Sequence, residues 1–149
     1  MKPDPVQLLL KRSEKEPFRQ FMDLEVLEIK PGNALVAMRF SKKLQNIFGM
    51  LHGGAVFSLL DEAFQLACNA HGQVAVAQEL TIYYLAPARA GARLLARVSE
   101  QHATRKTALY KAKVWEEDSE KMIARASAMA YRKGTDLPFN EKGELINES

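Results

Sequence analysis

Gly53, Gly54 and Asp61 are the residues whose types and spacing point most directly to chemistry. The glycines stand where a polar loop meets a long apolar stretch, which we expect to form a helix over about residues 54–70. The first amides of a helix lack intrahelical partners, and the helix dipole is positive there. The glycines therefore predict a site for an anion or a developing oxyanion. Asp61 interrupts the apolar stretch, and we expect its carboxylate to act as a base or nucleophile.

Each of these residues also has a purely structural interpretation. Asp61 could cap a neighbouring loop, but its apolar flanks should desolvate it and raise its pKa, which suits a base working near neutrality. The glycines could permit a tight loop or close helix packing. We favour the oxyanion role for Gly53 and expect packing to be the main role of Gly54.

The elements that must position the helix begin with an N-terminal segment, residues 1–22. Asp4 and Pro5 form an N-cap followed by proline at the first helical position, which predicts a short helix. Pro17 and Phe18 are expected to start a turn. We interpret the whole segment as a helical lid packed on the domain.

Period-two patterns then predict an antiparallel sheet. Residues 24–29 and 34–40 flank Pro31-Gly32-Asn33 and should form a hairpin. Four further strands are predicted after the helix, at residues 74–85, 92–102, 106–116 and 121–132. A strand of 11 residues spans ~37 Å and a 17-residue helix ~25 Å, so the sheet can wrap the helix. This α+β arrangement, one long central helix wrapped by a long-stranded antiparallel sheet, is the hotdog fold.

Composition excludes several classes of protein. The 149 residues suffice for one domain, and the single cysteine, Cys68, excludes an internal disulfide and suits a reducing compartment. No apolar run has the length of a membrane span, and no secretory signal is visible at the start. The net charge of +3 combines 21 basic with 18 acidic residues, too balanced to indicate nucleic-acid binding. We expect a cytoplasmic protein with no nucleic-acid or membrane partner.

The loop and helix also resemble a known family. Residues 46–54 are N-I-F-G-M-L-H-G-G, and residues 58–63 are S-L-L-D-E-A. They resemble the N-x-x-G-x-x-H-G-G…D signature of hotdog-fold acyl-CoA thioesterases of the phenylacetic-acid-pathway (PaaI-type) family. The stretch Y-L-A-P-A at residues 84–88 is similar to that family too. His-Gly-Gly alone is a weak signal, but asparagine seven residues before Gly53 and aspartate eight after it make the resemblance specific.

The resemblance implies a role for each matching residue. Gly53 would supply the amide that polarises a thioester carbonyl, and Asp61 would be the general base or nucleophile. Asn46 would orient water or the carboxylate, although it could also be a plain loop residue. His52 would have a supporting role where the loop meets the helix.

Substrate contacts are predicted at Gly54, Phe57 and Gln78. Relatives often carry Ser or Thr near Gln78 to hold the attacking water, and this chain departs from that pattern. Arg105 and Lys106 are interpreted either as solvated surface charges or as contacts to the coenzyme A phosphates. Apolar residues around the loop and helix suit an aryl or a medium-chain acyl group.

The predicted function is hydrolysis of an acyl-CoA thioester to a free acid and coenzyme A, with no cofactor, since coenzyme A belongs to the substrate. The alternatives are a non-catalytic acyl-CoA-binding hotdog protein and a hotdog hydratase or dehydratase. A metal site is not expected, because Cys68 and His71 share a helix face without further ligands nearby. The predicted domains are residues 1–22 as the lid, 23–133 as the hotdog thioesterase domain and 134–149 as a flexible tail.

Helix geometry predicts a shared site. Gly53 and Asp61 lie eight residues apart, hence ~12 Å along the helix axis. A carbonyl bound to the Gly53 amide therefore cannot also reach Asp61 of the same chain. We expect a homodimer with two composite active sites, each combining Asn46 and Gly53 of one chain with Asp61 of its partner. The resemblance implies that such dimers pair further into homotetramers.

Overall fold

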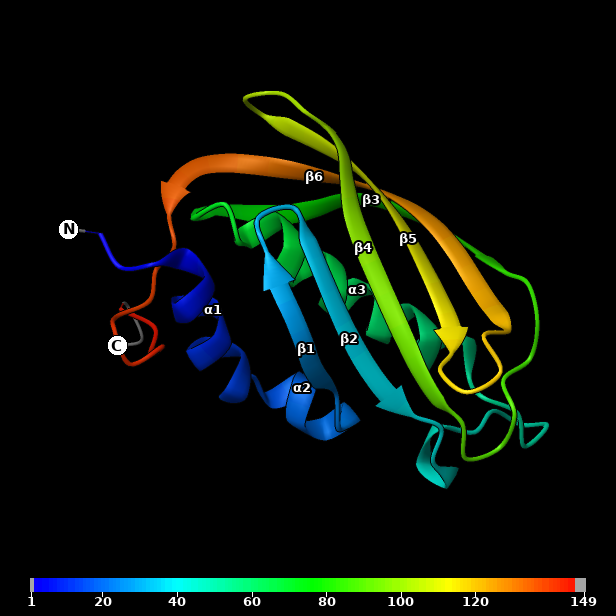
Figure 1. Ribbon diagram of the computed structural model, residues 1–149. Helices are drawn as coiled ribbons and strands as arrows, with labels where there is room; N and C mark the ends of the chain where they lie inside the picture. The colour runs from blue at the N-terminus through cyan, green and yellow to red at the C-terminus, as the bar shows by residue number, and fades with distance from the viewer. Residues whose placement is uncertain (1, 147–149) are drawn as a thin grey trace.

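The computed structural model describes residues 2–146 and shows an antiparallel sheet curved around one long helix, α3 (Gly53–Asn69) (Figure 1). The helix begins one residue before the predicted start, because His52 rather than Gly53 is its N-cap. Gly72 lies in the turn after the helix with a positive φ of 89°. This conformation favours glycine. The predicted α+β hotdog fold is confirmed.

The sheet has six strands in the order β1-β2-β4-β5-β6-β3. Their bounds are β1 Glu25–Lys30, β2 Asn33–Arg39, β3 Gln73–Tyr84, β4 Arg93–Ala103, β5 Thr107–Glu116 and β6 Met122–Asp136. All neighbouring strands are antiparallel, and the predicted hairpin is formed by β1 and β2. Strand β3 follows α3 in the chain but pairs with the last strand. It therefore forms one edge of the sheet.

Small side chains let the sheet close on the helix. Four alanines alternate along β6 and are at most 8% exposed: Ala124, Ala126, Ala128 and Ala130. They pack in the same core as the buried face of α3. Phe64 of α3 meets Tyr110 of β5 edge to face, with ring centroids 5.3 Å apart.

The N-terminal segment forms two helices, α1 (Pro5–Glu14) and α2 (Pro17–Met22). The predicted cap of α1 is confirmed, because the Asp4 carboxylate accepts a hydrogen bond from the Val6 amide at 3.0 Å. The stretch from Pro17, predicted as a turn, is instead the helix α2, with proline at its first position. A short 3₁₀ helix, η1 (Lys42–Leu44), precedes the loop to α3. None of the helices within residues 2–146 is long and apolar enough to cross a membrane.

The C-terminal segment differs from the expected flexible tail. Strand β6 continues past Gly134 to Asp136, and residues 137–146 lie beside α1 (Figure 1). Lys11 donates to the carbonyl of Glu141 at 2.8 Å, and the Arg12 guanidinium lies 5.8 Å from the centre of the Phe139 ring. Contacts with α1 thus hold a segment whose polar composition alone predicted fraying. Residues 147–149 of the predicted tail lie outside the described residues.

Candidate active site

At the start of α3, the amides of Gly53 and Gly54 differ in their hydrogen bonding. The Nδ1 atom of His52 accepts a hydrogen bond from the Gly54 amide at 2.8 Å, as a side-chain N-cap does. No residue among 2–146 accepts a hydrogen bond from the amide of Gly53. His52 thus satisfies one glycine amide and leaves the Gly53 amide free at the positive end of the helix dipole.

Gly53 lines a cleft of about 350 Å³ at this end of the helix, together with Met50, Leu51 and residues 84–88. The hydroxyl of Tyr84 donates to the Gly53 carbonyl at 2.9 Å. A methyl group added at Gly53 would lie 3.3 Å from the Tyr84 ring, so the close approach favours glycine. Tyr84 therefore ties the first turn of α3 to the end of β3.

Asn46 organises the loop that leads to the glycines. Its Oδ1 atom accepts hydrogen bonds from the amides of Phe48 and Met50 at 2.9 and 3.0 Å. The backbone N–H of Asn46 donates to the Met50 carbonyl at 2.7 Å. The side-chain oxygen is thus committed to the loop, and only the Nδ2 group remains for water or substrate. These contacts all lie within the loop, as the alternative structural interpretation of Asn46 expects.

Asp61 lines a second, smaller cleft of about 160 Å³, together with Phe64, Cys68 and the β3 residues 75–77. The pKa of its carboxyl is raised, because burial disfavours the charged form and, secondarily, because of the negative charge of Glu16. No hydrogen bond or cation within residues 2–146 opposes these effects. The carboxyl is therefore a stronger base than an ordinary aspartate, as its apolar flanks predicted.

The Gly53 and Asp61 clefts share no lining residue. The Gly53 cleft adjoins Tyr84 at one end of β3, and the Asp61 cleft adjoins Ala75, Val76 and Ala77 at the other. Along α3 the two residues are separated by ~12 Å. One chain by itself therefore holds the two predicted catalytic groups in separate clefts.

The predicted substrate-contacting residues are also spread over the molecule. Phe57 is half-buried on α3, one turn from Gly53 and one turn from Asp61. Gln78 is exposed on β3 at a register shift between Ala77 and Glu79, the geometry of a β-bulge. It does not line the Asp61 cleft.

Arg105 and Lys106 are exposed in the turn between β4 and β5. Through β6, this turn adjoins the Val76 end of β3, because Thr107 pairs with Tyr131 and Tyr131 with Val76. Within one chain these two cations are thus remote from Gly53, which contacts Tyr84 at the opposite end of the strand.

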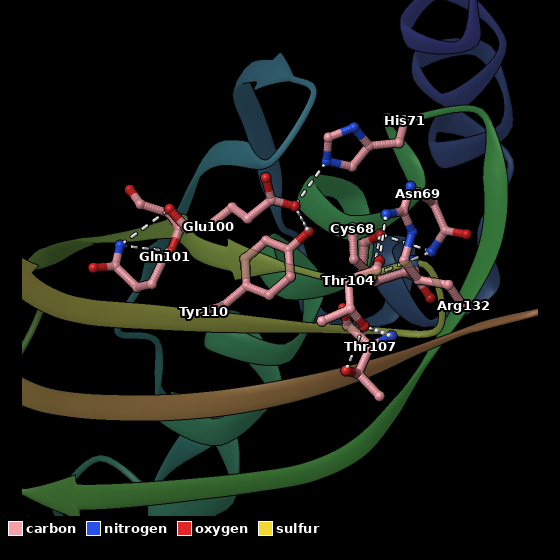
Figure 2. Close-up of polar contacts among 11 residues, drawn as sticks. Cys68, Asn69, His71, Glu100, Gln101, Thr104, Thr107, Tyr110 and Arg132 are labelled. Carbon is pink, nitrogen blue, oxygen red and sulfur yellow. Dashed lines mark hydrogen bonds and ion pairs between the residues drawn. The ribbon is translucent and has the colours of Figure 1, made fainter.

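A separate polar cluster lies beyond the end of α3 (Figure 2). Glu100 of β4 accepts hydrogen bonds from His71 at 2.9 Å and from the Tyr110 hydroxyl at 3.1 Å. His71 thus points toward Glu100, not toward Cys68, as Figure 2 shows. Burial raises the pKa of the Cys68 thiol to about 12, so it is neutral at physiological pH. Within residues 2–146, no three His, Cys, Asp or Glu side chains are grouped to hold a metal ion.

Three residues close to the predicted groups have no role that sequence patterns indicate: Tyr84, Glu16 and Glu62. Tyr84 was part of the family motif, so its position was signalled although its contact with Gly53 was not. Glu62 directly follows Asp61 but is only 4% exposed, whereas Asp61 lies beside a cleft. Glu16 reaches this region only because α1 packs on α3. No local pattern signals such a contact.

The chain is similar in sequence to known thioesterases and esterases. The family model described as "Thioesterase superfamily" matches residues 48–123. A putative esterase of Archaeoglobus fulgidus is 40% identical over 80% of this chain and 77% of its own length. The acyl-coenzyme A thioesterase PaaI of Escherichia coli is 34% identical over 65% of this chain and 69% of its own.

A solved structure of the E. coli PaaI protein from the phenylacetic acid degradation operon is similar in fold. It superposes with a TM-score of 0.82 at 27% identity, covering 90% of this chain and 99% of that one.

Replacing Asn46 by alanine should release the loop before α3. The amides of Phe48 and Met50 would lose their acceptor, so their hydrogen exchange should accelerate by about 5- to 10-fold, the scale of ~1 kcal/mol per hydrogen bond. Exchange measured by NMR on wild type and Asn46→Ala checks this.

Asn46→Asp is the matched control, because a carboxylate oxygen can accept the same two amides. Its exchange rates should remain near wild type. Equal acceleration in both variants would contradict the assignment of the loop to the Oδ1 atom.

Proposed function

The chain belongs to the thioesterase superfamily and is a thioester hydrolase, and from this premise we propose that it hydrolyses an acyl-CoA to a free acid and coenzyme A. The observation that carries the mechanism is the Gly53 amide at the helix start, which has no acceptor within residues 2–146 and lies beside the capped Gly54 amide and a cleft. An amide so placed can donate to the thioester oxygen as negative charge develops on it.

Asp61 is the proposed base or nucleophile. Its raised pKa favours proton abstraction from water near neutral pH. As a base it takes a proton while the water oxygen attacks the carbonyl carbon, and the thiolate of coenzyme A leaves. As a nucleophile it forms an anhydride that water then cleaves. Neither route requires a cofactor.

The separation of the two clefts supports a composite active site. A base must come within ~3 Å of the water or carbon that it serves, while Gly53 and Asp61 are ~12 Å apart along α3. We propose a homodimer in which Gly53 and the Asn46 loop of one chain face Asp61 of the partner. Pairing of such dimers into a homotetramer stays a prediction from the family resemblance.

The edge strand β3 is the proposed dimer contact. It is 12 residues long, its outer edge is unpaired within residues 2–146, and large apolar side chains on and after it are exposed. The most exposed are Tyr83, Tyr84 and Leu85, at 62%, 54% and 54%. Long apolar edges favour strand pairing with another chain.

Antiparallel pairing of two β3 strands would bring Gly53 of one chain close to Asp61 of its partner. It sets the 75–77 stretch of one strand, which lines the Asp61 cleft, beside the partner's Tyr84, which contacts the partner's Gly53. The same pairing brings the exposed Arg105 and Lys106 of one chain toward the partner's Gly53 cleft. We propose these two cations as contacts for the coenzyme A phosphates.

The remaining substrate contacts are proposed from the positions of residues on α3 and β3. Phe57 lies between the two catalytic groups on α3, and Phe64 lines the Asp61 cleft, which suits an aryl or medium-chain acyl group. Gln78 lies at the proposed dimer contact, where the bulge can direct its side chain toward a bound water. Gly54 contributes close packing. The cytoplasmic location predicted from the single cysteine and the lack of a secretory signal stays a prediction.

Asp61→Asn should keep the fold and lose at least 10²-fold in kcat, because it removes the base or nucleophile while preserving shape. Release of free thiol from a panel of acyl-CoA thioesters measures this. The wild-type panel also separates a hydrolase from a non-catalytic binder and from a hydratase, neither of which releases thiol.

Ser58→Ala serves as the control, because the Ser58 hydroxyl donates to the Gly54 carbonyl at 2.7 Å and has no proposed chemical role. It should retain near-normal kcat. Near-normal kcat in Asp61→Asn as well would mean that another group does the chemistry.

A heterodimer of Asp61→Asn and Asn46→Ala chains should recover about half of wild-type activity, although each homodimer is crippled. One composite site would inherit both defects and the other neither. Differently tagged chains, purified in sequence and assayed for thiol release, provide the measurement. No recovery in a verified heterodimer would place both residues in a site within one chain.

Replacing Arg105 and Lys106 together by alanine should raise KM for acyl-CoA about tenfold, ~1.4 kcal/mol, and leave kcat unchanged. Turnover of an acyl-pantetheine thioester, which lacks the nucleotide, should hardly change. The control removes two exposed cations elsewhere, Lys111 and Arg125, and should affect neither substrate. Equal losses on both thioesters would remove Arg105 and Lys106 from the phosphate site.

A further inference from the structure

Two further carboxyl groups lie near Asp61, the buried Glu62 and the partly exposed Glu16. Glu62 follows it on α3, is only 4% exposed, and its Oε1 atom is fully buried without a hydrogen-bond donor among residues 2–146. A buried carboxylate without a donor is strongly disfavoured, so such a group binds a proton instead.

Glu16 is the partner of this acid. It lies between α1 and α2, next to the face of α3 that carries Glu62 and, one turn later, Gln65. Its two oxygens also lie 3.3 and 3.4 Å from the Nε2 atom of Gln65, one turn beyond Asp61 on α3. Two carboxyl groups can hydrogen-bond only if one carries a proton. Because Glu62 is the more buried, the proton resides on Glu62 and the negative charge on Glu16.

We propose that Glu62 is a positioning residue, a neutral acid that donates a hydrogen bond to Glu16 and thereby holds the Glu16 charge close to Asp61. The inference rests on the proposed function, in which Asp61 is the base or nucleophile. It assigns a catalytic consequence to a glutamate on α1–α2 that does not itself contact substrate.

The other titratable groups facing this pair are consistent with the assignment. Arg19 is the nearby cation, but it donates to the Ser13 hydroxyl at 2.7 Å and to the Leu24 carbonyl at 3.1 Å. The Cys68 thiol faces Asp61 and is neutral, because burial raises its pKa. Burial first, and the contact with Glu16 second, raise the pKa of Glu62 to about 9.

The consequence for Asp61 is a higher pKa. Burial is the larger cause, and the charge of Glu16 is the second. A base whose pKa approaches the working pH transfers protons more effectively than an ordinary aspartate. The N-terminal segment therefore tunes the base through Glu16 rather than only covering the helix.

The first test is the pH profile of kcat/KM on the best acyl-CoA. Glu16→Gln should move the acid-side midpoint down by about one pH unit, because it removes the like charge but keeps a hydrogen-bonding group. Glu62→Leu should move it in the same direction, because Glu16 is no longer held. Glu62→Gln still donates through its amide and should keep the wild-type midpoint. Glu14→Gln, an exposed neighbour of Glu16 on α1, is the matched charge control.

The second test measures the protonation of Glu62 through the thermal stability of the protein, without an enzyme assay. A proton bound more tightly in the folded state stabilises the fold below the ordinary glutamate value of 4.5, and this stability is lost as the pH rises toward about 9. The Tm of wild type should therefore fall between pH 6 and pH 9 by more than the Tm of Glu62→Gln.

The outcomes separate this proposal from the proposed function. Parallel Tm profiles, or an unmoved midpoint in Glu16→Gln, would overturn the positioning role while Asp61→Asn still lost its activity. Near-normal turnover in Asp61→Asn would overturn the proposed mechanism, and the Tm comparison would still decide whether Glu62 is a neutral acid.

Discussion

Burial of α3 against the concave face of the sheet is the constraint on which the site depends. The buried alanines of β6 and the edge-to-face contact of Phe64 with Tyr110 contribute to this interface. One stripe of the helix remains uncovered, and it carries Gly53, Phe57 and Asp61 at spacings of four residues. The packing that stabilises the domain thus also decides which helix residues can meet a substrate.

A helix of this length brings a geometric consequence. Its start offers the Gly53 amide and a positive dipole, and its middle offers a desolvated carboxyl, but the distance between them exceeds the reach of one reacting carbon. The capping of Gly54 by His52 sharpens the first feature, because it leaves one amide and not two. Within residues 2–146 the outer edge of β3 is unpaired, and the two clefts lie at opposite ends of this strand. The proposed two-fold dimer would unite the two groups along this edge.

Desolvation acts differently on the three neighbouring carboxyl groups. Asp61 keeps access to a cleft and becomes a stronger base, whereas Glu62 is so buried that it holds a proton to high pH. Glu16 contributes to the raised pKa of both groups. Asp61 and Glu62 thus differ in how tightly they hold a proton, and burial, rather than residue type, distinguishes them.

Much of this protein follows from local patterns in its sequence. The alternation of apolar residues predicts every strand within a few residues, and the apolar stretch after Gly53 predicts α3, because side-chain period and backbone geometry are directly linked. The spacing of Asn46, Gly53 and Asp61 identifies the family, because these residues lie within one continuous segment, a loop followed by a helix. Only the tertiary structure decided that β3 is an edge strand, that the C-terminal segment packs on α1, and that Glu16 reaches Glu62. These features join residues far apart in the chain, and their stability comes from burial and pairing that no short stretch encodes.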